Sequence, residues 1–162
     1  MIKGLDSFGS DTSITIEPVN VIRQAVDLAL SVPCDDEGWD ADFASELNRI
    51  IQRFGEAAIE ELELELQDGQ RAAEIAEEIV FQLGAIEHEP TRNKRFSILG
   101  QYLKSNDVRL RHMAALGFAE MNDPLAGDEL RQAVSIKPSA RLRRNLNRII
   151  EKLERTQEWH AS

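Results

Sequence analysis

The sequence predicts an all-α fold in which about eight helices pair as antiparallel hairpins that stack on one another. The helix-forming residues Leu, Ile, Ala, Glu and Arg dominate the chain, and its 162 residues include only 9 Gly and 5 Pro. Apolar residues recur at helical spacing between the turn signals. The dipeptides Leu83-Gly84 and Leu116-Gly117 lie 33 positions apart, which is typical of helical-hairpin repeats.

Turn-forming residues mark the borders of the first helices. A proline suits the first turn of a helix over 18–31, and Gly55 ends a second helix over 40–54. Residues 62–66 alternate Leu and Glu, as a strand could, but Glu, Leu and Ala favour a third helix over 56–67.

The remaining helices follow from their apolar stripes. A fourth is expected over 70–86, a fifth over 91–104 and an eighth over 138–157, with two more between the fifth and the eighth. The expected organisation is a flexible arm over 1–17 that could include a short strand, one helical repeat domain over 18–157 and a frayed end over 158–162.

The sixth and seventh helices flank the turn Asn122-Asp123-Pro124. Asp107 stands where an N-cap belongs, and Pro124 suits the first turn of the seventh helix. Gly117 and the alanines before it are small, so a neighbouring helix can approach closely there. The residues expected to be buried are Val108, Met113, Ala114, Gly117, Phe118 and Met121 on the sixth helix, and Leu125, Leu130, Ala133 and Val134 on the seventh.

This unit resembles a HEAT repeat. The resemblance rests on Val108-Arg109, on Ala114-Ala115-Leu116-Gly117 and on the Asn-Asp-Pro turn, and it extends over residues 70–153. It implies an α-solenoid in which the helix pairs stack as a short right-handed superhelix, and which serves as a scaffold for binding other molecules.

Charge is distributed unevenly along the chain. Residues 1–90 carry a net charge of −16 and residues 91–162 carry +6, which gives −10 in total. Solvated helix faces would explain this pattern, and so would an acidic surface that meets a basic partner. The candidate partner-binding residues are Glu60, Glu61, Glu65, Glu74, Glu77 and Glu78.

The sequence lacks a recognisable catalytic, cofactor or metal motif. The three histidines are not spaced as metal ligands, and neighbouring carboxylates disfavour a Cys34 thiolate. We therefore expect a non-enzymatic, cofactor-free protein. A single cysteine, no apolar stretch long enough to cross a membrane and no secretory signal favour a cytoplasmic location.

The first function hypothesis is a stoichiometric binder or inhibitor of a basic protein, comparable to an immunity protein that blocks a nuclease toxin. A second is an adaptor or accessory subunit of an enzyme complex, including one similar to the HEAT-like bilin lyases. A third is nucleic-acid binding through the basic C-terminal helices, for which Arg141, Arg144 and Arg148 are the candidates. The acidic net charge argues against the third hypothesis.

Overall fold

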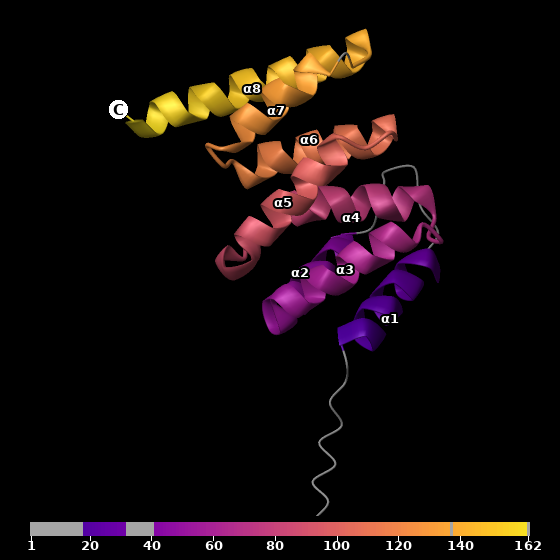
Figure 1. Cartoon of the computed structure of the whole chain (residues 1–162). Coiled ribbons are helices and arrows are strands. Elements are labelled where there is room, and N and C mark those ends of the chain that lie inside the picture. The colour runs from indigo at the N-terminus through magenta and orange to yellow at the C-terminus, as the bar shows by residue number, and fades with distance from the viewer. Residues whose placement is uncertain (1–17, 32–40, 137, 162) are drawn as a thin grey trace, which may run out of the picture.

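The computed structural model describes residues 18–31, 41–136 and 138–161. In this part of the chain it has eight α-helices, one short 3-10 helix and no strand, which confirms the all-α prediction. The elements in chain order are α1 (Pro18–Ser31), α2 (Ala41–Phe54), α3 (Glu56–Asp68), α4 (Ala73–Ala85), the 3-10 helix η1 (Glu89–Thr91), α5 (Arg92–Leu103), α6 (Val108–Met121), α7 (Ala126–Ser135) and α8 (Ala140–Ala161) (Figure 1).

The helices follow one another along the molecule from α1 at one end to α8 at the other (Figure 1). α4 packs on α6 and α6 packs on α8, whereas α3 packs on α5 and α5 packs on α7. Alternate helices are therefore neighbours. One buried apolar core runs through the stack, from Ile22 on α1 to Leu153 on α8. Among the described helices, none combines the length and the apolar character needed to cross a membrane.

The backbones of α4 and α6 touch at two glycines. A Cβ atom on Gly84 would lie 2.0 Å from the carbonyl oxygen of Gly117, so only glycine fits there. Ala114 and Ala115 are fully buried beside this crossing. The prediction that small residues of the sixth helix permit close packing is confirmed.

Aspartate side chains cap the start of α6 and the turn between α6 and α7. The Asp107 carboxylate accepts the backbone N–H of Arg109 at 2.8 Å, which confirms the predicted N-cap of α6. Asp123 accepts the N–H of Leu125 at 2.9 Å, and α7 begins only at Ala126. The prediction that Pro124 lies in the first turn of α7 is therefore wrong.

Several other expectations differ from the structure. Val108 and Leu125 were expected in the core but are 47% and 66% exposed, because they lie at the first turn of α6 and in the turn before α7. α8 continues to Ala161 rather than ending at residue 157, since no Gly or Pro interrupts it. The predicted arm over 1–17 and Cys34 lie outside the described residues.

Arg95 of α5 is buried, with only 2% of its surface exposed. Its guanidinium donates to the carbonyl oxygens of Leu83 at 2.7 Å and His88 at 3.0 Å, and to the Thr91 hydroxyl at 3.1 Å. Burial lowers the pKa of Arg95, and the positive charge of Arg92 lowers it further. The side chain thus caps the end of α4 and fixes the loop that leads into α5.

Candidate functional site

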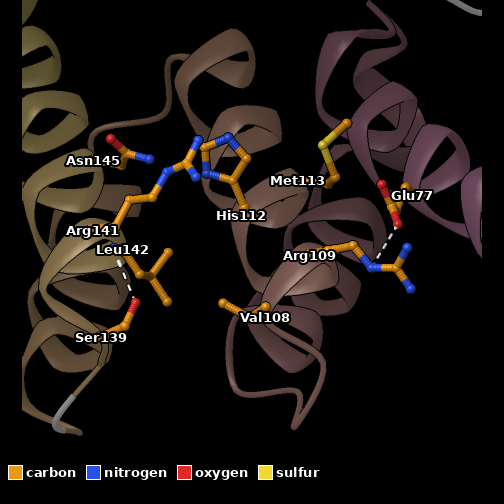
Figure 2. Close-up of a pocket in the computed structure, with 9 residues that line it drawn as sticks. All are labelled: Glu77, Val108, Arg109, His112, Met113, Ser139, Arg141, Leu142 and Asn145. Carbon is orange, nitrogen blue, oxygen red and sulfur yellow. Dashed lines mark hydrogen bonds and ion pairs between the residues drawn. The ribbon is translucent and has the colours of Figure 1, made fainter.

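A pocket of about 290 Å³ lies between α6 and α8, and we call it the α6–α8 pocket (Figure 2). The first turns of α6 and the start of α8 supply most of its lining, and Glu77 of α4 borders it. Because α4, α6 and α8 pack in succession, the pocket lies on the surface that these three helices share.

Polar groups line two sides of the pocket. On one side, Arg109 Nε lies 3.2 Å from Glu77 Oε1, so these two charges compensate each other. Figure 2 shows His112, Arg141 and Asn145 grouped on the other side. Arg141 makes no ion pair within the described part of the chain, and it therefore leaves this side positively charged.

Apolar groups complete the lining. Val108, Met113 and Leu142 contribute to the wall, and Val108 is the most exposed of the three. Sequence reasoning placed Val108 in the core. Its position in the first turn of α6, one residue after the Asp107 cap, was the signal that this side chain could face solvent instead.

Ser139 caps the start of α8. Its hydroxyl accepts the backbone N–H of Leu142 at 3.3 Å, and its carbonyl accepts that of Arg143 at 2.9 Å. The pocket therefore combines a cation, an imidazole, an amide and an apolar wall, a combination typical of ligand-binding pockets. Within the described residues, no group of three or more His, Cys, Asp or Glu is placed to hold a metal ion.

The six acidic candidates divide into two sets in the structure. Three of them form ion pairs with bases of other elements: Glu60 with Lys94, Glu65 with Arg71 and Arg23, and Glu77 with Arg109. The other three, Glu61, Glu74 and Glu78, have no cation within ion-pair distance in the described part of the chain.

The same division holds for the wider acidic block of residues 56–89, which contains 11 acidic residues and one base, Arg71. Four of these acids are paired: Glu60, Glu65, Glu77 and Glu89. Seven have no ion pair among the described residues, and we call them the open acidic set. They are Glu56, Glu61, Glu63, Asp68, Glu74, Glu78 and Glu87.

Lys94 of α5 lies close to several carboxylates of α3. Its side-chain hydrogen bond with Glu60 raises the pKa of Lys94, and the Glu56 and Glu63 carboxylates raise it further. One lysine of α5 is therefore exposed to the field of three carboxylates on one face of α3.

The bases of the C-terminal half also divide into two sets. One set is in ion pairs or buried: Arg92, Lys94, Lys104, Arg109 and Arg131 form ion pairs, and Arg95 is buried. The sequence-predicted basic candidates Arg141, Arg144 and Arg148 are exposed on α8, and within the described residues they have no ion pair.

Sequence reasoning did not identify which charges would pair. Glu60 and Lys94 are 34 positions apart, Glu77 and Arg109 are 32 apart, and both offsets are close to the 33-residue spacing of the two glycines. Each pair joins two helices that pack on one another, α3 with α5 and α4 with α6, so the spacing of about 33 residues was the signal for these pairs.

Comparison of the chain with models of known protein families, with curated proteins and with solved structures gave no match.

Proposed function

We propose that this chain is a non-catalytic binding protein that captures a basic protein through the open acidic set on α3, α4 and the loop after α4. The observation that carries the proposal is the seven carboxylates that form no ion pair with a base of the described chain. We further propose that the helices are HEAT-like hairpins stacked as a short right-handed superhelix, which would present these side chains on a rigid scaffold.

Repulsion among the acidic residues lowers the stability of the folded state unless a base compensates it. Like charges at this density repel one another and destabilise the folded state. The chain compensates four acids of the block internally, so it has bases available for pairing, yet seven acids are left. A basic partner would remove the repulsion, and the acidic field would accelerate its association.

A stoichiometric inhibitor fits this proposal best, in the manner of an immunity protein that covers a cationic active site. Such a partner, for example a nuclease that binds phosphates, carries the positive surface that the open acidic set would complement. The protein would then act in the cytoplasm, where it meets its target.

The experiment is a pull-down with the tagged full chain from nuclease-treated lysate, read by mass spectrometry at low and high salt. The proposal predicts one basic protein that is retained at low salt and released at about 1 M salt, where the Debye length falls to roughly 3 Å. An acidic or neutral partner, or a partner whose retention does not depend on salt, would contradict the proposal.

A further inference from the structure

We propose that α8 and the α6–α8 pocket form a second binding surface, which accepts an acidic, amphipathic segment of another protein. α8 lies at one end of the helix stack and α3 lies nearer the other end (Figure 1), whereas α4, which carries Glu74 and Glu78 of the open acidic set, borders the pocket through Glu77. The bases of α8 are different residues from the open acidic set, so variants in each set test the two proposals separately.

One face of α8 carries five bases, which we call the α8 basic stripe. Their spacing of three or four residues places them along one side of the helix over a length of about 21 Å. The opposite side is buried through Leu142, Leu146 and Leu153, so the stripe faces solvent. The stripe consists of Arg141, Arg144, Arg148, Lys152 and Arg155.

The stripe has no acidic counterpart in the described part of the chain. None of its members forms an ion pair there, although Arg155 donates to the carbonyl oxygen of Glu151. Arg131 of α7 differs, because it pairs with both Glu154 and Asp128. Arg144 and Arg148 are four residues apart, and like charges at that spacing destabilise a helix. Carboxylates of a partner would relieve this repulsion.

The pocket gives the surface an apolar anchor point beside the charge. Arg141 belongs both to the stripe and to the pocket, and Val108 and Leu142 stand on the pocket wall. The volume of about 290 Å³ accommodates a large apolar side chain. A helix with carboxylates on one edge and a leucine beside them would satisfy the stripe and the pocket together.

These features favour a protein segment over nucleic acid. The pocket lining contains no Phe, Tyr or Trp on which a base could stack, its one ring being the His112 imidazole, and it includes the Glu77 carboxylate. The whole chain carries a net charge of −10, which repels a long polyanion. A short acidic helix that lies along α8 is attracted by the α8 basic stripe and extends little beyond it.

The test uses a fluorescein-labelled helical peptide about four turns long, with glutamates on one face and leucines beside them. A twin peptide carries glutamine in place of each glutamate, and a labelled oligothymidylate represents nucleic acid. Fluorescence anisotropy with the full chain at low salt measures the three affinities. The acidic peptide is expected to bind at least about tenfold more tightly than either of the other two ligands.

Two variants of α8 locate the surface. Arg148→Glu lies in the stripe, and Arg143→Glu makes the same charge change at an exposed position outside it. Arg148→Glu should weaken peptide binding at least about tenfold, and Arg143→Glu much less. Circular dichroism confirms that both variants fold.

Val108→Ser tests the pocket in a double-mutant cycle with a peptide that has alanine in place of its leucines. The variant should weaken binding of the leucine peptide and leave that of the alanine peptide unchanged. Failure of the acidic peptide to bind, equal loss in the two α8 variants, equal effects of Val108→Ser on both peptides, or tighter binding of oligothymidylate would each overturn the proposal.

Discussion

Gly84 of α4 lies directly against Gly117 of α6, so that a Cβ atom on Gly84 would stand 2.3 Å from the Cα of Gly117. These two residues, 33 positions apart in the sequence, are thus in backbone contact. A Cβ on Gly117 would meet the Leu99 side chain at 3.0 Å and the carbonyl oxygens of Val80 and Phe81 at 3.4 Å, which is tight but less severe.

Gly84→Ala should therefore force α4 and α6 apart and destabilise the protein by about 1–3 kcal/mol. The measurement is the free energy of unfolding from urea denaturation. Gly100→Ala is the matched control in α5, because its Cβ would find only Glu129, at an ordinary 3.7 Å. That change should stabilise the helix by about 0.5–1 kcal/mol. Equal effects of the two changes would show that the helices cross elsewhere.

Arg95→Met should destabilise the protein by about 1–3 kcal/mol. Methionine fills the space but donates no hydrogen bond, and the carbonyl oxygens of Leu83 and His88 would lose their partner. Thermal unfolding checks this, with the exposed Arg143→Met expected to change the stability by less than about 0.5 kcal/mol. If Arg95→Met left the stability unchanged, the hydrogen bonds of Arg95 would not be needed to hold the α4–α5 loop in place.

Glu65→Gln and Glu61→Gln should separate structural from open acids on the same helix. Glu65 is 13% exposed at its side chain and pairs with Arg71 at 3.0 Å, whereas Glu61 has no ion pair among the described residues. Glu65→Gln should cost about 1 kcal/mol in unfolding free energy. Glu61→Gln should cost nothing measurable, and a loss as large as that of Glu65→Gln would refute the distinction.

Glu46 should contribute to the pH dependence of stability. Its hydrogen bond from Arg49, at 2.9 Å from Nε, lowers the pKa of Glu46 in the folded state. A carboxyl whose pKa is lower in the folded than in the unfolded chain stabilises the fold at neutral pH and loses this contribution as the pH falls through the folded-state pKa. In Arg49→Gln, an NMR titration should show the pKa of Glu46 returning toward its ordinary value. An unchanged pKa would exclude the pair as its cause.

The sequence was sufficient where local chemistry decides the structure. Helical apolar spacing predicted the elements, and the predicted Asp107 cap is confirmed. The close helix packing predicted at Gly117 is confirmed by its contact with Gly84. The Leu–Glu alternation of residues 62–66 is part of α3, because local helix propensity prevails over a short alternating pattern.

The sequence was insufficient where packing between helices decides the outcome. Leu125 and Val108 are apolar and correctly spaced, but their places at helix ends leave them exposed. Whether Glu60 or Glu61 is paired depends on which of the two faces Lys94 of α5, and this follows from helix rotation rather than from composition. The α6–α8 pocket could not be predicted for the same reason.

We propose that the open acidic set captures a basic partner. The most direct test is the association rate of the partner recovered in the pull-down, measured by stopped flow at low salt. Glu61→Lys/Glu74→Lys is compared with Glu120→Lys/Glu151→Lys, which changes the net charge equally but lies outside the acidic block. The account predicts at least about tenfold slower association for the first variant and a several-fold smaller effect for the second. Equal rates for the two variants would contradict it.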